Sequence, residues 1–233
     1  MDLKRPIIDA RSGKPSEAIP ERLPYEIQMR KEMGWALSES SLFFEGKGAV
    51  QETLRRITGR LNELDIPYAV VGGLALFAHD YQRYTEDVDL LVTPDGLKRI
   101  HKELDGLGYV PPFSGSKNLR DTDTKVKIEF LVTGQFPGDG KPKPVAFPDP
   151  ALAAVEKDGI KYLSLPALVE LKLASGMTNP LRLKDIADVM ELIKLARTPR
   201  QLADQLAPFV REKYLELWDL IDQARTADPE LPE

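Results

Sequence analysis

The sequence predicts an α+β protein, in which a small mixed β-sheet with helices packed on one side of it is followed by an α-helical C-terminal half. Strand patterns at 68–71, 87–92 and 125–132 are separated by helical patterns, without the regular repeat of a doubly wound parallel sheet. Glycine and proline then supply eight of the seventeen residues in 134–150, which is typical of a long loop. Beyond this loop helical periodicity prevails.

The composition excludes several kinds of site. The 233 residues include no cysteine, which rules out disulfides and thiolate-bound zinc, and the two histidines are too few for a typical histidine-rich metal site. A catalytic metal would therefore bind mainly carboxylate oxygens, as Mg²⁺ and Mn²⁺ do. The net charge of −5 argues against a protein that coats nucleic acid through bulk charge, but it does not exclude a local basic patch that contacts RNA.

Hydropathy predicts neither a membrane span nor a secretory signal. The apolar runs are shorter than the roughly 18–20 residues needed to cross a bilayer. The N-terminal segment also lacks the apolar core of a signal peptide. We therefore expect a cytoplasmic protein with no membrane partner.

The chain divides into three regions. Residues 1–45 are expected to form an N-terminal arm and helix, because four prolines precede a stretch rich in helix formers at 25–44. Residues 46–150 form the core region, in which the candidate site lies. Residues 151–233 form a helical C-terminal region, because the loop that ends at Pro150 separates mixed strand and helix patterns from patterns that are mainly helical.

The core region begins with an amphipathic helix at 48–64, where apolar residues recur at three- and four-residue spacing. A buried strand follows at 68–71 and is closed by Gly72 and Gly73, after which a short helix is expected at 74–78. The two glycines indicate either a tight strand–helix turn that needs positive φ or a turn whose bare amides approach an anion.

Two further strands complete the predicted core. The segment 87–92 alternates acidic and apolar residues at its start, and 125–132 places Lys127 and Glu129 on one face. Between them, Thr93-Pro94 predicts the start of a helix that continues to about residue 107, with Gly108 as its C-cap. In the C-terminal region the pattern predicts a short strand at 160–163 and helices at 166–174, 181–196, 199–206 and 208–225.

Asp87 and Asp89 are the strongest candidates for a metal site. Residues two apart on a strand point to one face and lie about 6.6 Å apart. Two carboxylates at that distance repel by roughly 2 kcal/mol at an effective dielectric near 20, and a divalent cation would turn this repulsion into attraction. The alternative is a solvated edge strand whose outer face is simply acidic. Glu129, on the polar face of a later strand, is either a third ligand or an exposed structural residue.

The order of these residues resembles the signature of the polymerase-beta-like nucleotidyltransferase superfamily. Gly72-Gly73 is followed after thirteen residues by Asp87-Val88-Asp89, and then by Ile128-Glu129-Phe130 on a later strand. The resemblance implies a nucleotidyltransferase-like fold whose glycine turn holds a triphosphate. It also implies that Asp87 and Asp89 bridge two Mg²⁺ (or Mn²⁺) ions, and that Glu129 completes the site and helps to deprotonate the acceptor hydroxyl. Glutamate stands here where aspartate is commoner.

A closer resemblance, over roughly residues 65–195, is to the bacterial nucleotidyltransferases that include the abortive-infection (AbiEii-like) toxins. It rests on Gly72-Gly73-Leu74-Ala75, Arg83-Tyr84-Thr85, Leu171-Lys172-Leu173 and the cluster from Arg182 to Asp188. This resemblance implies nucleotide binding by Gly72, Gly73, Arg83, Thr85, Lys172 and Lys184. The alternatives are that the lysines lie on a solvated helix face, that Arg83 and Thr85 only brace the turn, and that Lys184 pairs with Asp188. We expect His79 to be structural.

The function implied by the resemblance is transfer of a nucleoside monophosphate from a nucleoside triphosphate to an acceptor hydroxyl, with catalysis by Asp87, Asp89 and Glu129. The acceptor is tRNA or another RNA in toxin-like members and a protein or small molecule in others, and a toxin would have an antitoxin protein as its partner. The alternatives are a non-catalytic nucleotide-binding or scaffold domain and a kinase-like phosphotransferase with the same metal site.

Overall fold

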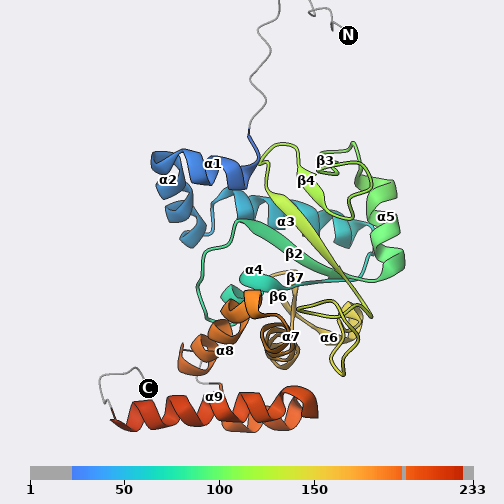
Figure 1. Cartoon of the computed structure of the whole chain (residues 1–233). Coiled ribbons are helices and arrows are strands. Elements are labelled where there is room, and N and C mark those ends of the chain that lie inside the picture. Colours follow the sequence, from blue (N-terminus) through green and yellow to red (C-terminus); the bar gives the residue numbers. More distant parts are fainter. Residues whose placement is uncertain (1–22, 196–197, 228–233) are drawn as a thin grey trace, which may run out of the picture.

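A computed structural model describes residues 23–195 and 198–227 of the chain. It contains a seven-stranded mixed sheet with the strand order β3-β4-β5-β2-β1-β7-β6 (Figure 1). The strands are β1 Tyr68–Val70, β2 Asp87–Val92, β3 Tyr109–Val110, β4 Leu119–Asp121, β5 Lys127–Val132, β6 Ala154–Lys157 and β7 Ile160–Leu163. The predicted fold class, a mixed sheet with packed helices and a helical C-terminal half, is confirmed.

The helices precede, interrupt and follow the sheet. They are α1 Tyr25–Lys31, α2 Met33–Phe44, α3 Ala49–Glu63, α4 Gly72–Ala78, α5 Pro94–Leu104, α6 Pro150–Ala153, α7 Leu165–Thr178, α8 Leu183–Leu195 and α9 Pro208–Ala227, with the 3₁₀ helices η1 Pro180–Arg182 and η2 Arg200–Gln205. The helix expected at 25–44 is divided into α1 and α2, and the arm expected before it lies almost entirely outside the described residues. Among the described residues, no helix combines the length and apolar character needed to span a membrane.

Helices cover both faces of the sheet, which corrects the expectation of helices on one side. Successive residues of a strand point to opposite faces. Val88 and Leu90 of β2 belong to one buried cluster, with residues of α2, α3 and α5, whereas Leu91 belongs to a second cluster, with residues of α7, α8 and α9. Figure 1 shows these two groups of helices on opposite sides of the sheet.

Two predicted boundaries in the core region were wrong. The helix expected to reach residue 107 ends at Leu104, because Asp105 is extended and the chain then turns through Gly106 and Gly108, both at positive φ. The strand expected from residue 125 begins at Lys127, because Lys125 has a left-handed φ of 62°.

Other differences involve short elements. The strands β3, β4 and β6 were not predicted, and each of them is defined by its pairing with a neighbouring strand. The segment expected to be helical at 199–206 forms the 3₁₀ helix η2. The sheet also continues beyond the loop at 134–150, since β7 pairs in parallel with β1. The change from mixed to mainly helical sequence patterns at residue 150 therefore does not coincide with the end of the sheet.

Candidate active site

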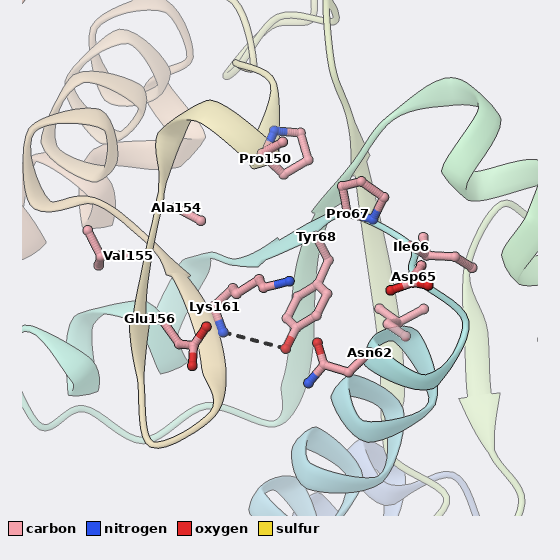
Figure 2. A pocket seen from close by; sticks show the side chains of 12 residues that line it. Asn62, Asp65, Ile66, Pro67, Tyr68, Pro150, Ala154, Val155, Glu156 and Lys161 are labelled. Atoms are coloured by element: carbon pink, nitrogen blue, oxygen red, sulfur yellow. Dashed lines mark hydrogen bonds between the residues drawn. The ribbon is translucent and has the colours of Figure 1, made fainter.

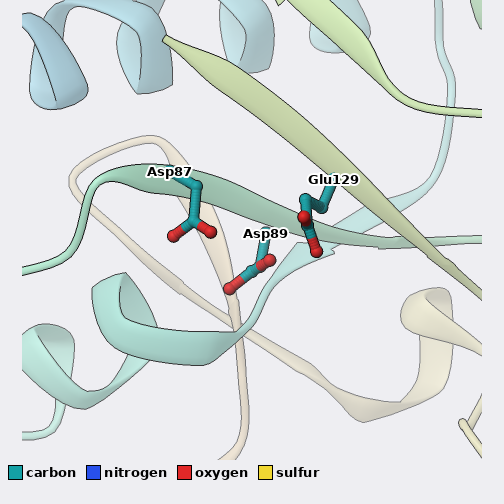
Figure 3. A group of neighbouring side chains, drawn as sticks. All are labelled: Asp87, Asp89 and Glu129. Atoms are coloured by element: carbon teal, nitrogen blue, oxygen red, sulfur yellow. The ribbon is translucent and has the colours of Figure 1, made fainter. Parts of the chain in front are cut away.

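Three carboxylates from two neighbouring strands meet at the site. Strands β2 and β5 are parallel, and Asp89 lies directly opposite Glu129 in their register. Asp87 precedes Asp89 by two residues and so points to the same face. One carboxylate oxygen from each of the three side chains lies within 4.8 Å of the others, and Figure 3 shows all three groups on the same side of the strands. The sheet pairing thus assembles the triad that the sequence predicts.

The triad lies where this face of the sheet emerges from the core. Leu91 and Leu131 continue the same face beyond Asp89 and Glu129, and both pack in the apolar cluster beneath α7 and α8. All three carboxylates, by contrast, are only partly buried. The face therefore changes from apolar to acidic along the strands, which leaves the carboxylates accessible at the edge of a packed core.

The electrostatics of the triad favour a bound cation. Burial, together with the charges of Asp87 and Glu129, raises the pKa of Asp89 to about 8. The positive charges of Lys172 and Arg182 oppose this rise in the pKa of Asp89. A divalent ion would remove the repulsion among the carboxylates, and an all-oxygen donor set of this kind suits Mg²⁺ or Mn²⁺. The residues present therefore fit a divalent metal ion.

Two neighbours hold the triad in place. The Thr85 hydroxyl donates a hydrogen bond of 2.6 Å to Oδ1 of Asp87. The Lys127 ammonium contacts Oε1 of Glu129. Thr85, predicted to bind nucleotide, is thus placed to orient Asp87, a candidate metal ligand. Lys127 was not among the predicted site residues, although its two-residue spacing from Glu129 on a strand already placed the two side chains on one face.

The glycine pair fits closely against these side chains. Gly72 has a φ of 62°, and a Cβ atom there would lie 2.9 Å from Cγ of Asp89 and overlap its Oδ2. A Cβ at Gly73 would lie 2.8 Å from Cβ of Thr85. The positive φ of Gly72 agrees with the tight turn that was one of the two alternatives from the sequence, and the approach of bare amides to an anion stays a prediction.

We expect Gly72→Ala to damage the site as well as the fold. Gly46→Ala is the matched control, since Gly46 has a φ of 73° with nothing within 4 Å of the added Cβ. Left-handed backbone alone costs alanine about 1 kcal/mol at either position. The Gly72 variant must also displace Asp89, so it should lose Mn²⁺ binding and stability beyond that of the Gly46 variant. Denaturant unfolding and Mn²⁺ titration measure both effects, and equal behaviour of the two variants would contradict the close packing.

A cavity of about 190 Å³ opens beside the triad. Its lining combines the acidic residues with basic and apolar ones from the loop at 134–150, from α7 and from the start of α8. The lining residues are Val71, Gly72, Asp87, Asp89, Glu129, Leu131, Pro137, Gly138, Phe147, Leu168, Leu171, Lys172, Ser175, Arg182 and Asp185. Of the predicted site residues, the triad, Gly72 and Lys172 therefore share one cavity, whereas Gly73, Arg83, Thr85 and Lys184 lie outside its lining.

A network of charges, in which Lys172, Asp185 and Asp188 are buried, adjoins this cavity. The Lys172 ammonium lies 3.1 Å from Oδ1 of Asp185 and 2.8 Å from Oδ2 of Asp188. Arg83 pairs with Asp188, with Nε 3.1 Å from Oδ1, and Arg182 pairs with Asp185 at 3.0 Å. Three cations and two carboxylates leave the network a net charge of +1. Two of the predicted nucleotide-binding residues, Lys172 and Arg83, are thus joined through Asp188.

Asp185, Lys184 and His79 have different surroundings. Burial raises the pKa of Asp185, but Lys172, the Ser175 hydroxyl and Arg182 together hold that pKa below its ordinary value. Lys184 is exposed on α8, where partial burial of its ammonium and the charge of Arg83 lower its pKa. His79 lies with Nε2 2.8 Å from the carbonyl oxygen of Leu163, a contact that ties α4 to β7 and supports the structural role expected for it.

A second cavity, of about 370 Å³, lies at the start of β1, whereas Gly72 follows the end of that strand. Figure 2 shows Tyr68 and Lys161 in its wall, where the Lys161 backbone N–H donates a 3.4 Å hydrogen bond to the Tyr68 hydroxyl oxygen. None of the residues that line this cavity belongs to the predicted site. The candidate site is therefore the cavity beside the triad.

No protein-family model matches the chain, and no curated protein matches its sequence. Among solved structures, it is similar to ANT(2'')-Ia in complex with adenylyl-2''-tobramycin, at 15% identity and a TM-score of 0.42 over 74% of this chain and 97% of that one. It is also similar to an antigenic nucleotidyltransferase-like protein from Paracoccidioides brasiliensis, at 17% identity and a TM-score of 0.40 over 77% and 88%. At these values the likeness describes the course of the backbone only.

Proposed function

We propose that this protein is a metal-dependent nucleotidyltransferase that moves a nucleoside monophosphate from a nucleoside triphosphate to an acceptor hydroxyl. The observation that carries the proposal is the meeting of Asp87, Asp89 and Glu129 within 4.8 Å, beside a cavity that also contains cationic side chains. Oxygen ligands for a divalent ion and positive charge for phosphates are the two requirements of phosphoryl-group chemistry.

Each group has a distinct task in the proposed reaction. A divalent ion held by the three carboxylates would polarise the phosphoryl oxygens and offset their charge. We assign Glu129 to take the proton of the acceptor hydroxyl as its oxygen bonds to the α-phosphorus. The bond from that phosphorus to the bridging oxygen breaks, and pyrophosphate leaves with the electron pair. Thr85 holds Asp87 in orientation throughout.

The charge network contributes as a unit. Lys172 lines the cavity, but its ammonium is already paired with Asp185 and Asp188. We therefore propose that Lys172 acts on the triphosphate through the net positive charge of the whole network. This charge attracts the phosphates without direct contact, and the attraction is strengthened because the site is partly desolvated. Lys184, being exposed, is assigned a direct and more flexible contact with the outer phosphates, and Gly72 and Gly73 keep the turn beneath them narrow.

A labelling experiment tests the function and separates it from its alternatives. The protein is incubated with Mg²⁺ and each nucleoside triphosphate labelled at the α- or γ-phosphate, with total RNA, with a small-molecule extract or alone. Label from the α-phosphate on an acceptor supports nucleotidyl transfer, whereas label from the γ-phosphate supports the kinase-like alternative. Label on tRNA supports the toxin-like acceptor. If expression of the protein inhibits cell growth, relief of that inhibition by a co-expressed protein from an adjacent gene would support an antitoxin partner.

Asp87→Ala is expected to abolish this labelling while the protein stays folded, because the variant removes a ligand from the partly exposed rim of the sheet. Circular dichroism and unfolding midpoints verify the fold. A fully active Asp87 variant would refute the assignment of the metal ligands. If the unaltered protein shows neither labelling nor metal-dependent nucleotide binding, the proposal that it is a nucleotidyltransferase is refuted.

A further inference from the structure

The loop at 134–150 forms one wall of the candidate site. Pro137, Gly138 and Phe147 of this loop line the cavity together with residues of α7. The base of the loop is closed by two backbone hydrogen bonds, from Gly134 N–H to the Phe147 carbonyl at 2.9 Å and from Phe147 N–H to the Gln135 carbonyl at 2.8 Å. Phe147 is therefore held at the root of the loop, while Pro137 and Gly138 lie on the projecting part.

The projecting part is seated on the last turns of α7 through Gly138. Gly138 has a φ of 74°, and a Cβ atom there would lie 2.7 Å from the Ser175 carbonyl oxygen and closer still to Oγ1 of Thr178. The Asn179 side-chain amide donates a 3.2 Å hydrogen bond to the Gly138 carbonyl. Backbone thus meets backbone at this point, which only glycine permits.

A buried lysine fastens the same loop. The side chain of Lys143 is only 6% exposed, and its ammonium contacts the Pro137 carbonyl, Asp139 and the Thr178 hydroxyl, the last at 3.2 Å. Burial of a lysine is stabilising only when its donors find acceptors, and here all three named acceptors lie on the loop or on α7. The loop is thus docked on α7 by specific contacts.

The cavity that the docked loop completes has both charged and apolar residues in its lining. The triad, Lys172, Arg182 and Asp185 are the charged residues, and Leu131, Leu168 and Leu171 are apolar residues that line it together with Pro137 and Phe147 of the loop. Lys172 and Leu168 belong to α7 and are separated by about one helical turn. A volume of about 190 Å³ is smaller than the roughly 300–1,000 Å³ of typical small-molecule sites, so it has room for one ring-bearing part of a substrate.

We propose that the loop at 134–150 is the base-binding wall of the site, where Phe147 and Pro137 contact the nucleobase of the nucleoside triphosphate. The proposal rests on the proposed function, since that substrate brings its charged phosphates to the triad and, on the other side of its ribose, a flat base whose faces stack on apolar and aromatic side chains. Gly138 and Lys143 are positioning residues, which act by holding the wall against α7. The ring of an acceptor molecule is the competing occupant.

The test compares four nucleoside triphosphates, which carry a base, with inorganic tripolyphosphate, which carries none. Binding of ATP, GTP, CTP, UTP and inorganic tripolyphosphate is measured with Mn²⁺ on the full chain, for the unaltered protein, Phe147→Ala and Gly138→Ala. Gly140→Ala is the matched control, because Gly140 belongs to the same loop, has a φ of 72° and has nothing within 4 Å of an added Cβ. Lys143→Met and Lys141→Met form a second pair, since Lys141 is exposed.

Loss of an aromatic contact to a base should weaken binding of at least one nucleoside triphosphate about tenfold or more, and should leave tripolyphosphate unchanged. Phe147→Ala, Gly138→Ala and Lys143→Met should show this pattern, and the Gly140 and Lys141 variants should not. If Phe147→Ala, Gly138→Ala and Lys143→Met all bind every nucleotide as the unaltered protein does, the proposal is overturned. The proposed transferase function would still stand, and the acceptor would then be the occupant assigned to this wall. Equal weakening of tripolyphosphate would overturn the base-binding proposal as well. Failure of the unaltered protein to bind any nucleotide with metal would remove the proposed function itself.

Discussion

Asp89→Asn is expected to abolish nucleotidyl transfer and, in the metal-free protein, to raise the free energy of unfolding. The pKa of Asp89 is raised to about 8, first by burial and then by the charges of Asp87 and Glu129. Asparagine keeps the shape of the side chain and removes its charge. Without metal the variant should gain on the order of 1 kcal/mol or more at neutral pH, because one unit of pKa shift corresponds to about 1.4 kcal/mol.

The pH dependence of this gain has a defined sign. A carboxyl whose pKa is higher in the folded protein than in the unfolded chain destabilises the fold increasingly as pH rises from its unfolded value, near 4, to its folded value, here about 8. The gain in the Asn variant should therefore be small below pH 4, grow between pH 4 and 8, and stay constant above pH 8. Urea unfolding in EDTA across this range measures it.

Function and stability should change in opposite directions at this residue. Loss of a metal ligand should lower transfer on the order of 10³-fold or more, because the phosphoryl charge is then left without its main stabilisation. Glu86→Gln is the control, since Glu86 is a carboxylate three residues earlier that lies outside the triad. An Asn variant that is less stable than the unaltered protein in EDTA at pH 8 would contradict the argument that the charge of Asp89 destabilises the metal-free fold.

The second large effect is expected from Asp188→Asn. The Asp188 side chain is 2% exposed and is paired with both Lys172 and Arg83. Removal of its charge leaves two cations short of a partner in a poorly solvated place, one of them the buried Lys172. Breaking a buried ion pair in this way typically costs about 3–5 kcal/mol, so the free energy of unfolding should fall by about that amount.

Asp219→Asn provides a matched control for this effect. Asp219 also accepts two contacts from an arginine, with Nε of Arg200 at 3.0 Å from its Oδ1, but both side chains are largely exposed. Solvent competes for such a surface pair, so little change in stability is expected. Urea unfolding of both variants makes the comparison. Similar midpoints for the two would show that the network adjoining the cavity contributes no more than a surface ion pair.

The sequence by itself determined the local features of this protein. Two-residue alternation placed Asp87 and Asp89 on one face of a strand and Lys127 and Glu129 on one face of another, and the structure has both strands. Three- and four-residue spacing likewise predicted the principal helices. These features depend on contacts between residues that are close along the chain, so periodicity alone reveals them.

Only the tertiary structure decided which of these faces meet. The parallel register of β2 and β5, which sets Glu129 opposite Asp89, joins residues forty positions apart, and no local pattern encodes that pairing. The same holds for Asp188, whose partner Arg83 lies 105 positions earlier in the chain, and for Gly138, whose close packing depends on α7. Periodicity reveals the direction in which a side chain points, whereas long-range packing selects its neighbour, and both were needed to assemble the acidic triad beside a cavity lined by charged and apolar residues.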